Sequence, residues 1–174
     1  LSPIRDGGLS LNAAAHVAGQ SLPNIFTTPF WVYFVVIGGC GSCLALAILL
    51  IRSKSKQLRT VGKIGIVPTF FGISEPIIFG VPLMLNPIFF IPFIFGSVVN
   101  ATIAYILMDI GIIGKTFAML SWQMPSIFGA FLSTMDIKAF LLIIVLIIID
   151  ILIYYPFFKI YEKQLVQQEI SEEE

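Results

Sequence analysis

The chain has 174 residues, of which 57% are hydrophobic and only 11% charged, with ten basic and ten acidic residues and a formal net charge of zero. Its mean hydropathy is +0.97, which is rare among water-soluble domains. Composition and the long uncharged runs together predict an all-α integral membrane protein, with lipid among its partners and no nucleic acid.

The first segment, residues 1–29, is mixed in character and is interrupted by glycines and prolines. We expect a lead-in loop with one short helix, around residues 11–19. His16 is the only histidine and stands alone in an Ala-rich stretch, where packing or solvation is the commoner role of a lone imidazole.

Residues 30–51 carry no charge and are long enough to cross about 30 Å of hydrocarbon, so we expect a first membrane span here. Four small residues predict a thin helix face for close helix packing. They are Gly38, Gly39, Gly41 and Ser42. Cys40 and Cys43 have the C-x-x-C spacing of redox and zinc sites. The apolar setting and the lack of a second pair favour two buried thiols and no metal site.

Residues 52–63 hold a cluster of basic residues directly after this span. An excess of Lys and Arg beside a span marks the cytoplasmic side of a membrane. We therefore expect the first span to run from outside to inside, and 52–63 to be a cytoplasmic segment. This topological explanation accounts for the positive charge without nucleic-acid binding.

Glu75 is the only charged residue between residues 64 and 108. A carboxylate at membrane depth is costly unless it faces a cavity, a partner or a substrate, so Glu75 is a candidate functional residue. Gly and Pro residues punctuate 64–85 too densely for one continuous helix. We predict a re-entrant hairpin here, since irregular backbone is tolerated at that depth only inside protein or beside a cavity.

The length of each apolar run, and the residues that interrupt it, also divide the rest of the chain into predicted segments. Residues 86–108 are a second predicted span, and 116–135 are a broken or re-entrant segment because polar residues and a proline interrupt it. Residues 138–159 are the last predicted span. Two complete crossings after the basic segment return the tail, 160–174, to the cytoplasm.

Two residues keep alternative roles. Asp150 is a second carboxylate in an apolar run, where a hydrogen bond to a neighbouring helix is the ordinary role and a functional one the alternative. Trp122 is either an anchor at the membrane interface or a platform on which a sugar ring stacks.

Several motifs together resemble those of a known family. They are Leu22-Pro23-Asn24-Ile25, Ser53-Lys54-Ser55-Lys56-Gln57-Leu58, Gly65-Ile66-Val67-Pro68, Ile73-Ser74-Glu75-Pro76-Ile77-Ile78-Phe79-Gly80-Val81-Pro82, Leu85-Asn86-Pro87 and Tyr154-Tyr155-Pro156-Phe157-Phe158-Lys159. The block around Glu75 is the most specific. Over nearly its whole length the chain resembles enzyme IIC, the membrane-embedded sugar-translocating component of the bacterial phosphoenolpyruvate-dependent phosphotransferase system, in its lactose, cellobiose and diacetylchitobiose branch.

The resemblance implies spanning helices and re-entrant helical hairpins that line a sugar site in the bacterial inner membrane. It also implies that the chain is the C-terminal part of a longer component. The missing N-terminal half would supply further spans, most of a homodimer interface, and a hairpin with a sugar-holding histidine to which no residue here corresponds.

The residues that the resemblance places at the sugar are Asn24, Ser74, Glu75 and Trp122. Glu75 would contact the sugar hydroxyl that becomes phosphorylated, as a hydrogen-bond acceptor or general base. The family's usual Trp-Thr-Thr-Pro-Pro is replaced here by Trp122-Gln123-Met124-Pro125-Ser126, which leaves open the disaccharide, of the cellobiose, diacetylchitobiose or lactose type.

The phosphate donor implied by the resemblance is a phosphocysteine on a soluble IIB subunit, with no cofactor. Nothing in this chain is expected to carry the phosphoryl group, because apolar surroundings keep Cys40 and Cys43 as neutral thiols. The chain would be the transport subunit of a protein-phosphohistidine–sugar phosphotransferase complex. Two alternatives are an ion-coupled secondary sugar transporter that uses Glu75 or Asp150, and a membrane scaffold that binds no sugar.

Overall fold

The computed structural model describes residues 2–83 and 85–173. In that part of the chain every regular element is helical, which confirms the predicted all-α class. The elements are α1 (Ser2–Val17), the π-helix η1 (Phe30–Val35), the 3-10 turn η2 (Cys40–Ser42), α2 (Cys43–Ile51), α3 (Lys56–Phe70), α4 (Glu75–Gly80), α5 (Pro87–Asp109), α6 (Ser126–Thr134) and α7 (Ile137–Glu173).

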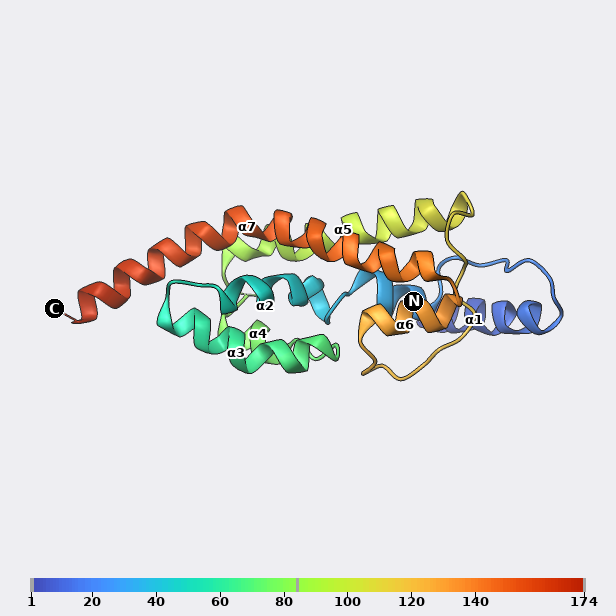
Figure 1. The fold of residues 1–174 in the computed structure, drawn as a ribbon, viewed down its shortest axis with the longest axis horizontal. Coiled ribbons are helices and arrows are strands. Elements are labelled where there is room, and N and C mark those ends of the chain that lie inside the picture. Colours follow the sequence, from blue (N-terminus) through green and yellow to red (C-terminus); the bar gives the residue numbers. More distant parts are fainter. Residues whose placement is uncertain (1, 84, 174) are drawn as a thin grey trace.

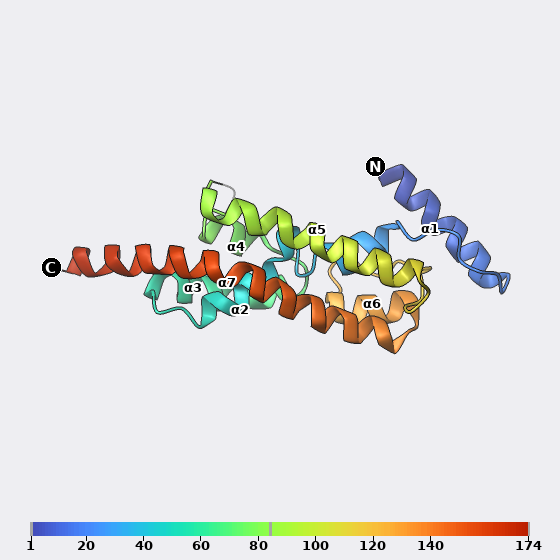
Figure 2. The same cartoon turned by 90° about the horizontal axis from the view of Figure 1, so that it is seen from above.

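The helices form an elongated bundle. α5 and α7 pack along one another, α2 packs against α7, and α3 folds back along α2 with α4 beside it (Figure 1). α6 packs on the first part of α7 and on η1. Seen from above, α1 projects from one end of the bundle (Figure 2).

α1 begins earlier than the short helix expected around residues 11–19 and includes two glycines. Asn12 connects it to the rest of the molecule, because its Nδ2 donates hydrogen bonds to the carbonyl oxygens of Asn24 and Thr116, each at 2.7 Å. The His16 ring stacks on Phe117 with their centroids 3.8 Å apart. His16 therefore has a packing contact, the commoner of its two expected roles.

The helix expected across residues 30–51 is interrupted between η1 and α2. Gly38, Gly39, Gly41 and Ser42 all have positive φ angles in this interval. Glycine reaches such conformations at little cost, whereas a helix cannot contain them. The interpretation of these small residues as a helix face for packing is therefore wrong, since they form the break itself.

Three helical segments in the described residues are long and apolar enough to cross a membrane. They are Phe30–Ile51, Pro87–Asp109 and Ile137–Ser171. With 37 residues, α7 is much longer than the roughly 20 that a crossing needs, so the segment expected as a tail after Lys159 is helical as far as Glu173.

The remaining segments contain shorter elements. α3 begins at Lys56, inside the basic segment, and α3 and α4 form a helical hairpin whose turn contains Gly72 at φ 82°. Within residues 116–135 the first part has no regular structure, and the nine-residue α6 that follows is about 14 Å long at 1.5 Å per residue. α6 is too short to cross a membrane alone.

Glu162, on the extension of α7, binds the loop between α2 and α3. Its Oε1 accepts hydrogen bonds from Ser53 Oγ at 2.8 Å and the Lys54 amide at 2.7 Å, and its Oε2 accepts one from Lys159 Nζ at 2.8 Å. The carboxylate is buried. It therefore fixes the end of α2 to α7.

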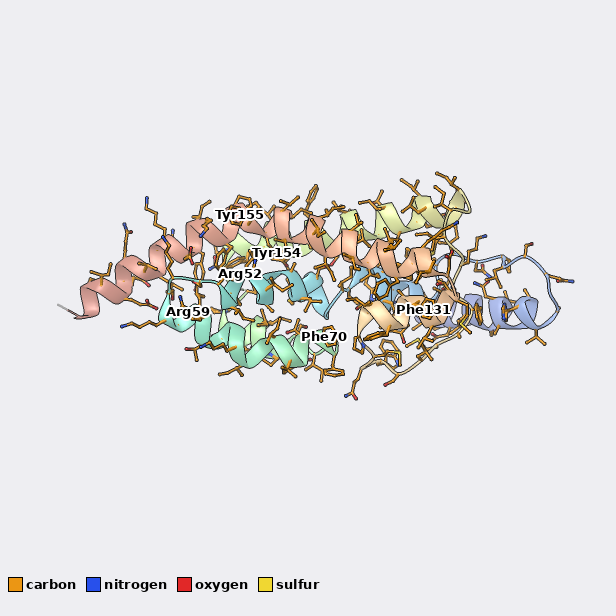
Figure 3. The ribbon with its side chains drawn as sticks, in the orientation of Figure 1. Arg52, Arg59, Phe70, Phe131, Tyr154 and Tyr155 are labelled. Atoms are coloured by element: carbon orange, nitrogen blue, oxygen red, sulfur yellow. The ribbon has the colours of Figure 1, made fainter. Side chains whose placement is uncertain are left out.

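Glu169 caps the start of α3 from one side. Its carboxylate accepts hydrogen bonds from Ser55 Oγ at 2.6 Å and from the amides of Lys56 and Gln57 at 3.1 Å. The first amides of a helix lack partners within the helix and favour a nearby negative charge. The α7 extension thus lies against the basic segment at one end of the bundle, where Arg52 and Arg59 are labelled in Figure 3.

We expect Glu162→Gln to reduce stability at neutral pH, with the difference from wild type shrinking as the pH falls into the acid range. Burial acts to raise the pKa of Glu162, but the hydrogen bonds from Lys159, the Lys54 amide and Ser53 outweigh it and hold this pKa below its usual range. A carboxylate with a lowered folded-state pKa stabilises above its unfolded value of about 4.3, and that contribution is lost as pH falls through the folded pKa.

Thermal unfolding of the two proteins in detergent between about pH 7 and pH 3.5 tests this, since the difference in stability should begin to shrink once the pH falls below the unfolded pKa. The loss at pH 7 should be about 2 kcal/mol, typical of hydrogen bonds to a charged group. Glu169→Gln is the control, with a smaller expected effect because Glu169 is only partly buried whereas Glu162 is buried. A Glu162→Gln deficit that stays constant across the pH range contradicts the assignment.

Candidate functional site

A cavity of about 270 Å³ lies where the interrupted helix, the turn of the α3–α4 hairpin and the segment before α6 meet. It combines aromatic rings, small polar groups and one carboxylate. The lining residues are Trp31, Val32, Val36, Gly39, Cys40, Gly72, Ser74, Glu75, Trp122, Met124 and Ser126. Ligand sites commonly have this mixture of apolar walls and a few convergent polar groups.

Glu75 supplies the only ionisable carboxylate among these lining residues. It is the first residue of α4, and Pro76 follows it at the helix start, where a proline costs no hydrogen bond. Glu75 is exposed, and its carboxylate has no hydrogen-bond or ion-pair partner among the described residues. An ionised carboxylate is an acceptor only, so it is free to receive hydrogen bonds from the hydroxyl groups of a ligand.

Ser74 and Gly39 bring the hairpin against the break in the first span. A Cβ atom on Gly39 would lie 2.6 Å from both Cβ and Oγ of Ser74, and 3.0 Å from the Gly72 carbonyl oxygen. Gly39 also has a φ of 96°. Only glycine fits this position, and the close approach places Ser74 and Glu75 at the wall formed by the break.

Trp122 lines the cavity from the irregular segment before α6. Its side chain is 63% exposed. The Tyr33 hydroxyl donates a hydrogen bond to the neighbouring Ser121 carbonyl oxygen at 3.1 Å, which ties this segment to η1. The indole is thus available to a ligand although the backbone beside it is anchored.

Asn24 does not lie in this cavity. Its amide nitrogen donates to Asn12 Oδ1 at 2.9 Å, and its side-chain Nδ2 donates to the Gly8 carbonyl oxygen at 3.4 Å. These contacts join the segment after α1 to α1 itself. Of the four residues expected at the sugar, the structure brings together Ser74, Glu75 and Trp122, and places Asn24 elsewhere.

Two lining residues were not expected from the sequence. Cys40 is exposed, which corrects the expectation that both thiols are buried, whereas Cys43 is buried. The helix break turns Cys40 toward the cavity. Trp31, at the start of the predicted span, adds a second indole to the walls. The glycine cluster around Cys40 was the available signal, because glycines in that density are also typical of a backbone break.

Asp150 lies outside the cavity, fully buried on α7. It accepts a hydrogen bond from Asn100 Nδ2 on α5 at 2.8 Å. This is the contact with a neighbouring helix that is the ordinary role of a carboxylate in an apolar run. Glu75 is therefore the carboxylate available to a ligand in this part of the molecule.

The sequence of the chain is similar to those of several known permease components. The permease IIC component YwbA of Bacillus subtilis, described as putative, is 38% identical over 99% of this chain and 40% of its own length. The lichenan permease IIC component of the same organism is 38% identical over 97% of this chain and 38% of its own. The lactose-specific EIICB component of Staphylococcus haemolyticus is 36% identical over the whole chain and 30% of its own.

A solved structure has the same fold. It is the crystal structure of the transporter ChbC, the IIC component of an N,N'-diacetylchitobiose-specific phosphotransferase system, with a TM-score of 0.94 at 34% identity over 97% of this chain and 40% of that one. This match and the long apolar helices confirm an all-α membrane protein. The chain spans 30–40% of the length of these relatives. The family model for the phosphotransferase system EIIC matches residues 4–97, more than half of the chain, and the chain therefore belongs to the EIIC family of the phosphotransferase system.

Proposed function

We propose that the chain forms part of a sugar-specific permease component, which binds a disaccharide and moves it across the bacterial inner membrane as a IIB subunit phosphorylates it. The observation that carries the proposal is the cavity in which the unpartnered carboxylate of Glu75 lies together with two indole rings. Hydroxyl groups and C–H faces are the two recognisable features of a sugar ring, and the carboxylate and the indoles match them. Relatives named for lactose and diacetylchitobiose support the same substrate class.

The phosphoryl transfer assigns one role to Glu75. A sugar hydroxyl attacks the phosphorus of the IIB phosphocysteine, so that an O–P bond forms while the S–P bond breaks. Glu75 accepts the hydrogen bond of that hydroxyl and takes its proton as the bond forms. The cysteine leaves as a thiolate on the partner, and this chain is never phosphorylated.

The cavity is slightly smaller than the 300–1,000 Å³ usual for ligand pockets. We infer that the rest of a longer component, including the copy expected in a homodimer, supplies the other walls. The α3–α4 hairpin that carries Glu75 touches the break through Ser74, so it is the element we expect to shift as a body during translocation.

The orientation we propose puts the basic segment 52–63 and the α7 extension on the cytoplasmic side. They meet at one end of the bundle, where Glu162 and Glu169 bind the loop before α3 (Figure 1). Lys and Arg next to a span favour that side. A soluble IIB subunit would approach the sugar from there.

The test uses the complete component in lipid vesicles, with lactose, cellobiose and diacetylchitobiose as labelled probes. We expect at least one of them to bind and to accumulate as sugar phosphate only with phosphoenolpyruvate and a phosphorylated IIB subunit. A proton ionophore should not reduce that accumulation. Uptake driven by an ion gradient without phosphoenolpyruvate, or no binding of any of the three sugars, would overturn the proposal.

The same assay on Trp122 variants separates the two roles of that side chain. Trp122→Ala should weaken disaccharide binding by about tenfold, or about 1.4 kcal/mol, because an exposed indole in the cavity loses its stacking contact. Trp122→Phe, which keeps an aromatic face, is the matched control and should retain much of the affinity. Unchanged affinity with reduced thermal stability would instead identify Trp122 as an interface anchor.

A further inference from the structure

We propose that Asp150 is a positioning residue for the cavity, acting through Asn100 to hold Ser42 in the backbone conformation that shapes the wall beside Glu75. The inference rests on the proposed function in so far as it assigns the cavity to a sugar. Its structural part concerns the break in the first span and does not depend on the ligand.

The network joins three segments inside the bundle. Asp150 on α7 and Asn100 on α5 are both fully buried, and Asn100 Nδ2 donates to Asp150 Oδ2 at 2.8 Å and to Ser42 Oγ at 2.9 Å. The Ser42 hydroxyl donates in turn to the Val35 carbonyl oxygen at 3.4 Å. Gly96 lets the carboxylate approach α5, because a Cβ atom there would lie 3.0 Å from Asp150 Oδ1.

Ser42 needs such a contact because of its backbone conformation. It lies at φ 55° and ψ 43°, in the left-handed region. That region disfavours a residue other than glycine by an amount comparable to the contribution of one hydrogen bond, so one contact can decide which conformation is populated. The anchored side chain offsets the strain.

A second contact holds the same turn. The buried Tyr154 hydroxyl on α7 donates to the Gly41 carbonyl oxygen. Figure 3 shows Tyr154 on the side of α7 that faces α2, whereas Tyr155 lies on the outer side. α7 therefore holds the turn at two neighbouring residues, one through Asn100 and one directly.

The turn held in this way forms a wall of the cavity. Gly39 and Cys40 line the cavity, and Gly39 approaches Ser74 as described above. Ser74 directly precedes Glu75. A continuous series of contacts thus leads from Asp150 through Asn100 and the turn to the residue beside the catalytic carboxylate.

The hydrogen-bond network of Asp150 and Asn100 is better suited to fixing the conformation of the turn than to stabilising the fold. Asp150 Oδ1 and Asn100 Oδ1 are buried without a hydrogen-bond partner in the described residues. Buried polar groups left without partners are costly, so an apolar pair would suit stability better at this site. A polar pair is useful at this site because the hydrogen bond from Asn100 to Ser42 selects one conformation of the turn.

The experiment compares Asp150→Ala with Asp150→Asn in the complete component. Asp150→Ala should weaken disaccharide binding at least about tenfold and should change the alkylation rate of Cys40 by a similar factor, because loss of about 1.4 kcal/mol releases the turn. Asp150→Asn is the matched control. It keeps an oxygen for the Asn100 amide and places its own amide where Oδ1 has no partner, so both measurements should stay within about threefold of wild type.

Ser42→Gly provides the decisive rescue. Glycine adopts the left-handed conformation without an anchored side chain. Adding it to Asp150→Ala should restore most of the affinity and the wild-type Cys40 rate, whereas lost packing around residue 150 would remain lost. If Asp150→Ala does not fold, Asn100→Ala with and without Ser42→Gly replaces it, because Asn100 donates directly to Ser42.

Cys40 alkylation without sugar separates this inference from the proposed function. A changed rate in Asp150→Ala with rescue by Ser42→Gly supports the positioning role even if no tested sugar binds the wild type. An unchanged Cys40 rate and affinity with reduced thermal stability, or a failure of Ser42→Gly to restore both in the Asp150 and the Asn100 background, overturns it.

Discussion

Glu75→Gln in the complete component should weaken sugar binding by at least about tenfold, because hydrogen bonds to a charged acceptor contribute about 1.5–3 kcal/mol. Phosphorylation of sugar that still binds should slow by about 10²–10⁴, the range attributed to a general base. Stability should change little, since the carboxylate has no partner among the described residues that the substitution would break.

Isothermal titration and single-turnover phosphorylation on the purified variant measure the two effects separately. Asp109→Asn is a suitable control, because it removes an exposed carboxylate at the end of α5, outside the cavity. Wild-type affinity and rate in Glu75→Gln would show that the sugar hydroxyl is held by another group. A Glu75→Gln protein that binds normally and phosphorylates slowly would restrict Glu75 to the proton transfer.

Glu75 could be found from the sequence because its signal is local. One carboxylate in a long uncharged stretch, next to Gly72 and Pro76, indicates both a functional charge and a broken backbone. The lengths of the apolar runs likewise located the helical segments that became α5 and most of α7, since hydrocarbon thickness fixes the length a span needs. These features depend on the order of residues and on no distant contact.

The break at residues 38–42 could not be found in the same way. A cluster of small residues in an apolar run serves equally for close helix packing and for a change of backbone direction. The structure shows this break in contact with distant residues, as in the hydrogen bond from Asn100 to Ser42, 58 positions apart in the chain. The exposure of Cys40 to the cavity follows from that break, so it was missed with it.

The helical extension of α7 at the end of the chain was also not predicted from the sequence. Acidic residues after an apolar run are typical of a solvated tail, yet α7 continues through them as far as Glu173. Glu162 and Glu169 find their partners in the loop before α3, more than a hundred positions away. The contacts of Glu162 and Glu169 with this distant loop explain why α7 continues. Asn24 pairs with Asn12 outside the cavity, and its place near the sugar stays a prediction of the resemblance.

Gly39→Ala should strongly weaken sugar binding although it adds only a single methyl group. The new Cβ would lie 2.6 Å from Cβ and Oγ of Ser74, far inside normal contact distance, and the φ of 96° disfavours any residue with a Cβ. The contact involves a buried serine next to Glu75, so the hairpin and the break must separate. We expect sugar binding to fall at least about a hundredfold, equivalent to about 2.7 kcal/mol.

Gly111→Ala is the control for a positive φ angle without a collision. Gly111 has a φ of 80°, and a Cβ there would meet nothing within 4 Å. Gly39, at φ 96° and ψ -172°, lies in a region that is essentially confined to glycine, so Gly39→Ala should lower thermal stability more than Gly111→Ala does. Only Gly39→Ala adds a collision between the two walls of the cavity. Equal losses of affinity in the two variants would mean that strain alone matters, and that the contact between Gly39 and Ser74 does not position Glu75.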